Sequence, residues 1–324
     1  MTAPPPTIGT PAAEIAIDAD LARRLLVSQH PDLAHLPITS VGSGWDNAMF
    51  RLGDELALRL PHRASAAQLL LNEQTWLPRL RAQLPLPIPA PVRTGQAQDG
   101  FPWPWSVTPW MSGETADLTL PDARQGERLA AFFTALHCPA PADAPLNPVR
   151  GVPLASRLEV FQSRYARLAG KTDRLDAGIM AIWADALVAP DDAAPTWIHG
   201  DLHPRNVLVE EGRLSAIIDW GDMAQGDRAS DLASVWMLLP DRSAREDAIA
   251  GCPEVSQATW QRARGWAVLY GVMLLDAGLA DDPRMVTIAE RIFARLIEGP
   301  YGPLRHASHA TSPGGGGMGR YERS

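Results

Sequence analysis

The segments Trp197–Asn206, WIHGDLHPRN, and Leu214–Asp222, LSAIIDWGD, contain the residues that decide the fold of this chain. Between them lie the apolar run Val207–Val209 and a polar stretch that contains Gly212. Two short apolar runs separated by a turn with glycine are typical of a β-hairpin. We therefore predict a hairpin that begins directly after the first segment and ends within the second.

This hairpin would bring two oxygen-bearing side chains together at its open end. Opposed residues of an antiparallel pair have numbers with a constant sum, so a turn centred between Gly212 and Arg213 places Asn206 opposite Asp219. Such residues have Cα atoms about 4.5–5.5 Å apart. Another carboxylate, Asp201, lies on the loop before Asn206. Because Mg²⁺ prefers hard oxygen ligands, Asn206 and Asp219 are candidate metal ligands.

The pattern Asp201-x-x-x-x-Asn206 followed by Asp219 resembles the catalytic loop and the metal-binding aspartate of protein kinases. With Gly200 after His199, it resembles more closely the aminoglycoside phosphotransferase family, whose pattern is H-G-D-x-x-x-x-N followed by I-D-W or a similar aspartate. The resemblance implies that Asp201 orients an acceptor hydroxyl and takes its proton. It also implies that Asn206 and Asp219 hold Mg²⁺ across the phosphates of ATP or GTP. An ordinary hairpin with surface acids is the alternative.

Composition restricts the class of partner. The chain has 324 residues, of which 46% are hydrophobic and 20% charged, and a formal net charge of −8. Such a negative balance argues against nucleic-acid binding, which needs a basic surface. No apolar run approaches the ~20 residues of a membrane span, and the N-terminus lacks the features of a secretory signal. With two isolated cysteines, Cys138 and Cys252, we expect a cytoplasmic protein without a membrane partner.

A Gly-Ser-Gly triplet precedes a second predicted hairpin. Gly42, Ser43 and Gly44 precede two strands that we predict within residues 48–60. By resemblance to kinases, this is the position of the loop that covers the nucleotide phosphates, and glycines allow the backbone to approach them closely. A plain turn explains the triplet equally well. Asn47 would either steady the phosphate loop or make a local turn hydrogen bond.

The returning strand and the next helix predict an ion pair. Leu56–Arg59 resembles the V-A-I-K strand of kinases with arginine in place of the phosphate-binding lysine. The single lysine of the chain, Lys171, lies far downstream. Residues 64–80 have helical periodicity, and Glu73 lies within their apolar stripe, where a carboxylate is costly unless it is paired. We expect Glu73 to pair with Arg59 and Arg59 to contact the phosphates; a solvated strand-edge arginine is the alternative.

The resemblance implies an α+β, bilobal, protein-kinase-like fold. Its small N-terminal lobe, with an antiparallel sheet and one main helix, would bind the nucleotide over residues 14–110. A larger and mostly helical lobe over residues 111–305 would provide catalysis and acceptor binding. Met111, in the connection between the lobes, would contribute to adenine recognition. We expect residues 1–13 and 306–324 to be disordered tails, because they are rich in proline and alanine or in glycine.

Three further residues are interpreted around the first segment. Asp231, at the start of an apolar helix, would brace the catalytic loop from beneath, as in the resembled family, or merely provide negative charge at a helix N-terminus. His203 falls where protein kinases carry a lysine that faces the γ-phosphate. His137 follows an apolar helical stripe, and we interpret it as a structural histidine.

These features favour a phosphotransferase with Mg²⁺ as cofactor, ATP or GTP as co-substrate and a hydroxyl-bearing small molecule as acceptor. A protein serine/threonine kinase and a non-catalytic nucleotide-binding scaffold are the alternatives. The acceptor stays open between an aminoglycoside-like antibiotic and a metabolite. A polycation would need carboxylates, and a macrolide would need apolar side chains. The C-terminal half offers both kinds: Asp222, Asp276, Asp281 and Asp282, and Trp236, Trp260, Trp266 and Tyr270.

Overall fold

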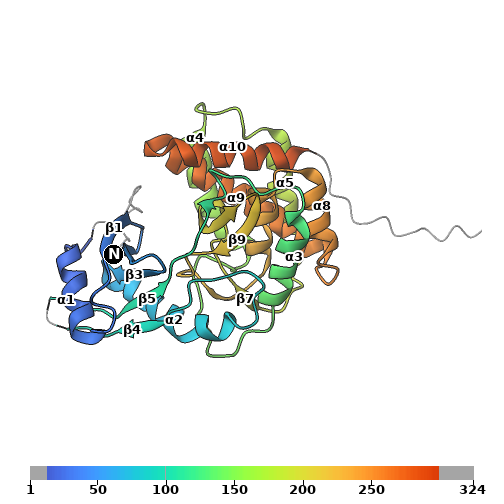
Figure 1. Ribbon diagram of the computed structural model, residues 1–324. Helices are drawn as coiled ribbons and strands as arrows, with labels where there is room; N and C mark the ends of the chain where they lie inside the picture. Colours follow the sequence, from blue (N-terminus) through green and yellow to red (C-terminus); the bar gives the residue numbers. More distant parts are fainter. Residues whose placement is uncertain (1–12, 99, 299–324) are drawn as a thin grey trace, which may run out of the picture.

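Five antiparallel strands form the sheet of the N-terminal lobe, at the left of Figure 1 in the computed structural model, which describes residues 13–98 and 100–298. Their order is β1-β2-β3-β5-β4, and every neighbouring pair is antiparallel. The strands are β1 (Ile38–Ser43), β2 (Asn47–Leu52), β3 (Leu56–Pro61), β4 (Arg93–Gly95) and β5 (Trp105–Pro109). Helix α1 (Ala19–Gln29) packs its Leu21, Leu25 and Leu26 into the same hydrophobic core as the strands.

Helix α2 (Ala64–Leu80) connects this lobe to the rest of the molecule. Near its middle, Gln74 donates hydrogen bonds of 3.0 Å to the Trp105 carbonyl and to the Ser106 hydroxyl of β5. At its C-terminal end, Trp76, Leu77 and Leu80 are buried in the other, larger hydrophobic core. One rigid helix therefore participates in both lobes.

The C-terminal lobe is mostly helical, and α9 runs through its centre (Figure 1). Apolar side chains cover α9 on all sides, which is typical of a helix buried along its length. It packs against α4, α5, α6, α7 and α10. The helices of this lobe are α3 (Gln125–Leu136), α4 (Leu158–Leu168), α5 (Ala177–Val188), α6 (Ala229–Leu232), α7 (Ser234–Leu238), α8 (Arg242–Ala250), α9 (Gln257–Asp281) and α10 (Pro283–Ile297), with short 3-10 turns η1 (Leu154–Arg157) and η2 (Pro204–Asn206).

Two small sheets surround the first sequence segment. One contains β6 (Glu114–Thr115), β8 (Val207–Glu210) and β9 (Arg213–Ile217), and the other pairs β7 (Thr196–Ile198) with β10 (Ala224–Gly226). The predicted hairpin is present as β8 and β9, but its predicted register is wrong by one residue. The turn is centred between Glu211 and Gly212, because Glu210 pairs with Arg213. A bulge between Leu208 and Val209 then recovers one of the two residues of this shift, so Asn206 faces Ile218, whose N–H donates to the Asn206 carbonyl at 2.9 Å. Asp219 is therefore the next residue along.

The bilobal α+β fold is confirmed, and α2 has the predicted bounds. Strand β1 was not predicted; it places Gly42 and Ser43 within a strand rather than in a loop before the sheet. The proposed tails, except Ala13, lie outside the described residues. Among the helices that the structure describes, none combines the length and apolar character needed to cross a bilayer.

Candidate active site

A buried aspartate holds the loop that carries Asp201. Asp231 of α6 accepts hydrogen bonds from the backbone N–H groups of His199, at 2.7 Å, and Gly200, at 2.9 Å. The His137 ring lies 3.3 Å from the same carboxylate, and the Asp231 side chain is fully buried. The bracing role predicted for Asp231 and the structural role predicted for His137 are both confirmed.

Gly200 is required by the conformation of this loop. Its φ is 87°, in the left-handed region that residues with a side chain rarely adopt. A Cβ atom at this position would lie 2.4 Å from the carbonyl oxygen of Asp222. Any larger residue would therefore push the loop away from the chain that follows Asp219, so the protein-kinase arginine does not fit here.

Both oxygens of the Asp201 carboxylate have basic or amide neighbours. Arg150 donates from Nη2 to Oδ1 at 2.7 Å, and His203 Nε2 lies 3.4 Å from Oδ2. The Asn206 amide nitrogen is also 3.4 Å from Oδ2. Burial would raise the pKa of Asp201, but the charges of Arg150 and His203 outweigh it and hold that pKa well below the ordinary value. Asp201 is therefore a carboxylate at neutral pH.

The candidate metal ligands present oxygens that protein groups do not use. Asn206 donates from Nδ2 to the Asp201 carbonyl at 2.9 Å, and because that partner is an acceptor, the amide oxygen points away from it. Asp219 has φ 60° and is exposed, and among the described residues no group donates a hydrogen bond to its carboxylate. Loss of hydration raises the pKa of the Asp219 carboxyl group, and the negative charge of Asp201 raises it further. The positive charge of Arg59 opposes both effects. Free oxygens with a raised proton affinity fit a divalent cation.

The predicted ion pair between Arg59 and Glu73 is confirmed. The two guanidinium nitrogens of Arg59 donate to the two carboxylate oxygens of Glu73, with Nη2 to Oε1 at 3.0 Å. The side chains are only 7% and 1% exposed. Burial would lower the pKa of Arg59, but the carboxylates of Glu73 and Asp219 together raise it. The positive charge of Arg59 is thus attracted both by Glu73 on α2 and by Asp219, which follows β9.

The Gly42-Ser43-Gly44 triplet spans the end of β1 and the start of the β1–β2 turn. Gly42 has φ 111°, and a Cβ there would meet nothing within 4 Å. Gly44 donates its N–H to the Asn47 carbonyl at 2.9 Å, so the turn hydrogen bond uses the Asn47 backbone. The Asn47 side-chain oxygen is buried without a hydrogen-bond partner. For Ser43 the structure describes only the backbone, which pairs with Ala48. Gly42 therefore faces open space.

Met111 is half-buried and lies between β5 and β6, in the connection between the lobes. The preceding residue, Trp110, donates its N–H to the Glu55 carbonyl at 2.7 Å. The predicted location of Met111 at the junction is therefore observed, while its contact with adenine stays a prediction.

Arg150 was not anticipated from the sequence. It lies 51 positions before Asp201 in a loop without periodicity, so no spacing connects the two. Asn147 fixes this loop by accepting from the N–H groups of Val149, at 2.9 Å, and Arg150, at 3.1 Å. Gly151, with φ 61°, allows the chain to pass closely beside β10. An asparagine followed by Pro-Val-Arg-Gly predicts a turn, but nothing in this stretch indicates that Arg150 would contact Asp201.

The aromatic residues considered for an apolar acceptor site lie mostly in the core. Trp236 and Trp266 are fully buried, and Trp260 packs against the same core. Tyr270 is buried as well, and its hydroxyl donates to the Gly200 carbonyl at 2.7 Å. These side chains support the lobe and the catalytic loop rather than forming an open apolar site.

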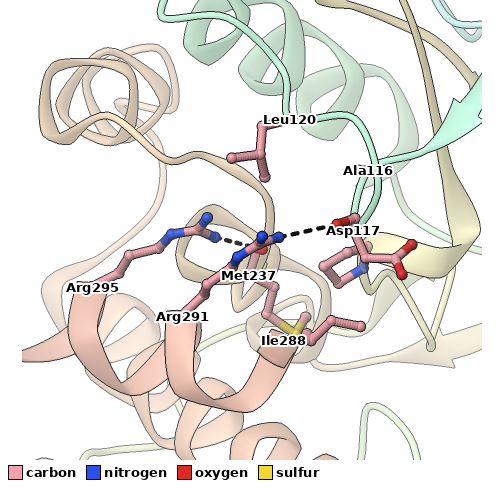
Figure 2. Close-up of a pocket in the computed structure, with 8 residues that line it drawn as sticks. Ala116, Asp117, Leu120, Met237, Ile288, Arg291 and Arg295 are labelled. Atoms are coloured by element: carbon pink, nitrogen blue, oxygen red, sulfur yellow. Dashed lines mark hydrogen bonds between the residues drawn. The ribbon is translucent and has the colours of Figure 1, made fainter. Parts of the chain in front are cut away.

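A shallow depression lies beside Pro204, between α7, α10 and the loop after β6 (Figure 2). Arg291 and Arg295 reach across it from α10. Arg291 donates to the Asp117 carbonyl at 3.0 Å and Arg295 donates to the Met237 carbonyl at 2.6 Å. Both arginines donate to backbone carbonyls and so connect α10 to the neighbouring elements. None of the candidate site residues lines this depression.

Comparisons with known proteins agree with this arrangement. The model of a family described as "Phosphotransferase enzyme family" matches residues 37–266. An aminoglycoside 3'-phosphotransferase of Escherichia coli is 29% identical over 152 residues, which are 43% of this chain and 54% of that protein. A protein of the same name from Salmonella typhimurium matches over the same shares. The chain thus spans about half the length of the curated relatives it matches.

Solved structures share the fold. The GDP complex of aminoglycoside 2'-phosphotransferase-IIIa has a TM-score of 0.57 at 19% identity, over 85% of this chain and 97% of that one. The apoenzyme of a macrolide 2'-phosphotransferase from Brachybacterium faecium has a TM-score of 0.54 at 19% identity, over 88% and 99% of the two chains. Both similarities extend across the two lobes.

Proposed function

The chain belongs to the phosphotransferase enzyme family, and on that premise we propose that it transfers the γ-phosphoryl group of ATP or GTP to a hydroxyl of a small molecule. The observation that carries the proposal is the electrostatic position of Asp219. Its carboxylate interacts electrostatically both with the guanidinium of Arg59, on the strand that would hold phosphates, and with the carboxylate of Asp201, on the loop that would hold the acceptor. Phosphoryl transfer needs those two binding functions on either side of one metal-binding carboxylate.

On the nucleotide side, Arg59 would bind the α- and β-phosphates while Glu73 fixes its guanidinium. Arginine can bind two phosphate oxygens through paired hydrogen bonds. The backbone of Gly42, Ser43 and Gly44 would cover the phosphates, with Asn47 beneath the turn. Residues 14–110 would form the nucleotide-binding lobe, with Met111 near the base, and a cytoplasmic location would supply the triphosphate.

Asn206 and Asp219 would hold Mg²⁺, which neutralises charge on the phosphate oxygens when bound. Two observations support binding of a cation by this pair. The Asn206 side-chain nitrogen donates to the Asp201 carbonyl, which leaves the amide oxygen for a metal ion, and the Asp219 carboxylate accepts no hydrogen bond from the described residues. A hard cation with oxygen ligands suits this pair.

On the acceptor side, Asp201 would accept a hydrogen bond from the reacting hydroxyl and take its proton. A carboxylate oxygen has two acceptor positions, so the hydroxyl can share Oδ1 with Arg150. The lowered pKa makes Asp201 a weak base, which suits a reaction that depends mainly on positioning. Residues 111–305 would provide this lobe. The relatives are named for aminoglycosides or macrolides, and the acceptor here would likewise be a small hydroxylated molecule.

The two alternatives fit less well. Protein kinases that bind an activation-loop phosphate use an arginine at the position of Gly200, and the positive φ and close contact of Gly200 oppose an arginine there. The chain after Asp219 continues directly into β10 and α6, with little room for an activation loop. A scaffold has no need for a carboxylate held on the loop at Asp201.

The proposal is tested by nucleotide turnover with a panel of hydroxylated metabolites and antibiotics, with ATP and GTP, in Mg²⁺ and in EDTA. We expect acceptor-dependent turnover that EDTA abolishes and that Asp201→Asn reduces by about 10²-fold or more, the scale of losing a general base. Asp173→Asn is the control, because that side chain is 97% exposed. Turnover of the Asp201→Asn variant equal to that of the control would refute the assignment of Asp201.

A further inference from the structure

Most of the acids in the C-terminal half that could bind a cationic acceptor are paired with arginines. Three such pairs are Arg164–Asp276 at 3.0 Å, Arg167–Asp276 at 3.1 Å and Arg205–Asp282 at 2.8 Å. Asp281 is exposed at the end of α9. The acid Asp222 differs from these, because it shares its arginine, Arg150, with the candidate catalytic residue Asp201.

The guanidinium of Arg150 lies between two carboxylates and an aromatic ring. Its Nη2 donates to Asp201 Oδ1 at 2.7 Å, and its Nε donates to Asp222 Oδ2 at 3.4 Å. The same group lies over the Tyr270 ring, 5.1 Å from the centroid, where the face of the ring attracts a cation. The two carboxylates and the ring together form a site for a cation, called the cation site below. A side chain of the protein itself occupies it.

The turn that carries Arg150 is attached to the chain on both sides of this residue. Before it, Asn147 accepts from the Arg150 N–H at 3.1 Å and donates from its amide to Asp222 Oδ1 at 2.8 Å. After it, the Gly151 carbonyl accepts from the Asp227 N–H at 2.7 Å. The Arg150 side chain is 14% exposed. Its guanidinium is therefore held in the cation site by a fixed backbone and by direct contacts.

The charges in the cation site depend on one another. Burial would lower the pKa of Arg150, but the carboxylates of Asp201 and Asp222 raise it well above its ordinary value, so the guanidinium stays charged. Without Arg150, two partly buried carboxylates would face each other with no cation between them, which is unfavourable. An ammonium group of an acceptor could enter only by displacing hydrogen bonds between charged groups, which are the stronger kind.

We propose that Arg150 is a positioning and specificity-determining residue, which holds the Asp201 carboxylate for the acceptor hydroxyl and excludes acceptors that carry an ammonium group next to that hydroxyl. The proposal rests on the proposed phosphotransferase function, because it assigns the acceptor of that reaction. Arg150 donates hydrogen bonds and exchanges no proton. The acceptor presents a neutral surrounding to the cation site, and removing Arg150 opens the site to cations.

The first test measures binding to the full chain by calorimetry at constant ionic strength. The probes are two cyclitols: myo-inositol, which is uncharged, and 2-deoxystreptamine, in which ammonium groups flank hydroxyls. We expect the wild type to bind 2-deoxystreptamine no more tightly than myo-inositol. Arg150→Ala should bind 2-deoxystreptamine at least about tenfold more tightly than the wild type does, the scale of one hydrogen bond between charged groups. In Arg150→Ala/Asp222→Asn, which lacks one carboxylate, this gain should disappear.

The second test measures turnover with the acceptor that the panel of hydroxylated compounds identifies. Arg150→Ala should lower kcat by at least about tenfold and leave KM for ATP unchanged, because Arg150 contacts the acceptor side of the site. Methylguanidinium, which reproduces the missing group, should restore part of this kcat. Arg150→Lys keeps the charge but cannot bridge two carboxylates as a planar guanidinium does, so its kcat should lie between those of the wild type and Arg150→Ala.

Arg284→Ala is the matched control, because Arg284 donates from Nε and Nη2 to Asp117 at 2.9 and 2.6 Å, and its removal leaves one carboxylate rather than two. It should keep the wild-type affinity for 2-deoxystreptamine and show no rescue by methylguanidinium.

The proposal is overturned if the wild type prefers 2-deoxystreptamine to myo-inositol, or if Arg150→Ala gains no affinity for it. Wild-type kcat in Arg150→Ala, or absence of rescue by methylguanidinium, overturns it as well. If Arg150→Ala does not fold, as judged by circular dichroism, wild-type kcat in a folded Arg150→Lys variant overturns the positioning role. The predicted gain in binding without phosphorylation of any acceptor would count against the phosphotransferase function and leave the cation site standing. Acceptor turnover without the gain would do the opposite.

Discussion

Replacing the two members of the Arg59–Glu73 pair, singly and together, separates its contribution to stability from its contribution to catalysis. In Arg59→Met, the Glu73 carboxylate, only 1% exposed, loses both of its hydrogen-bond donors. Leaving one member of a buried pair alone costs about 3–5 kcal/mol of unfolding free energy. In the double variant Arg59→Met/Glu73→Leu no charge remains buried, and the unfolding free energy should return close to that of the wild type.

Activity should follow a different order. A hydrogen bond to a charged group contributes about 1.5–3 kcal/mol, which corresponds to about 10–100-fold in kcat/KM for the nucleotide. Both variants lack the cation, so both should show this loss, including the stable double variant. Arg59→Lys keeps the charge but loses the paired bond, and we expect its activity to lie between those of the wild type and Arg59→Met.

Urea denaturation at pH 5 and pH 8 and steady-state kinetics with varied ATP provide the two measurements. Burial raises the pKa of Glu73 even beside Arg59, and without Arg59 the folded state binds the proton more tightly than the unfolded state does. The Arg59→Met variant should therefore be less stable at pH 8 than at pH 5. Arg174→Met, which breaks the exposed Arg174–Glu290 pair, is the control and should change stability by about 0.2–1 kcal/mol. Wild-type kcat/KM in the double variant would refute the assignment of Arg59 to the phosphates.

Four other predictions concern the loop and the core. Asp231→Ala leaves the buried N–H groups of His199 and Gly200 without acceptors and should cost about 2–6 kcal/mol in urea denaturation, so a loss below 1 kcal/mol would contradict the bracing role. Gly200→Ala should lower kcat by at least about tenfold, whereas Gly170→Ala, with φ 73° but open space around it, should cost only about 1–2 kcal/mol of stability; equal kcat values would show that the close contact of Gly200 does not matter. Burial raises the pKa of Cys252 to about 12, so the unfolded state loses the thiol proton at a lower pH than the folded state does. The free energy of unfolding should therefore fall as the pH rises from about 8.5 towards 12. In the native protein iodoacetamide should label Cys138 before Cys252, as followed by mass spectrometry, and the reverse order would contradict the burial of Cys252.

Short motifs and periodicity predicted much of this structure because their causes are local. The bounds of α2 follow from an uninterrupted apolar stripe, and the partner of Glu73 follows from the cost of burying a lone carboxylate. The register of the β8–β9 hairpin was predicted one residue out, because the turn is formed by Glu211 and Gly212, both with positive φ, and a non-glycine residue rarely adopts that conformation. The bulge after Leu208, which the sequence pattern does not show either, compensates for part of the shift.

The surroundings of Asp201 depend on contacts between distant segments. Arg150 reaches it from a loop 51 residues away, and Tyr270 contacts the same loop from α9. The acids of the C-terminal half were visible in the sequence, but not their arginine partners, because Arg164 and Asp276 are 112 residues apart. Composition alone therefore suggested free carboxylates where the structure has neutralised ones.

The course of α2 through both hydrophobic cores also bears on regulation. Protein kinases switch activity by moving the helix that carries the equivalent glutamate. Here the same helix buries Trp76, Leu77 and Leu80 in the large core, and exposing those side chains would cost about 1.5–3 kcal/mol each, or about 5–9 kcal/mol in total. At that cost a withdrawn position of Glu73 would be populated in fewer than about one molecule in 10³. We therefore expect the protein to be constitutively competent, with a rate set by the concentrations of nucleotide and acceptor rather than by an inactive conformation.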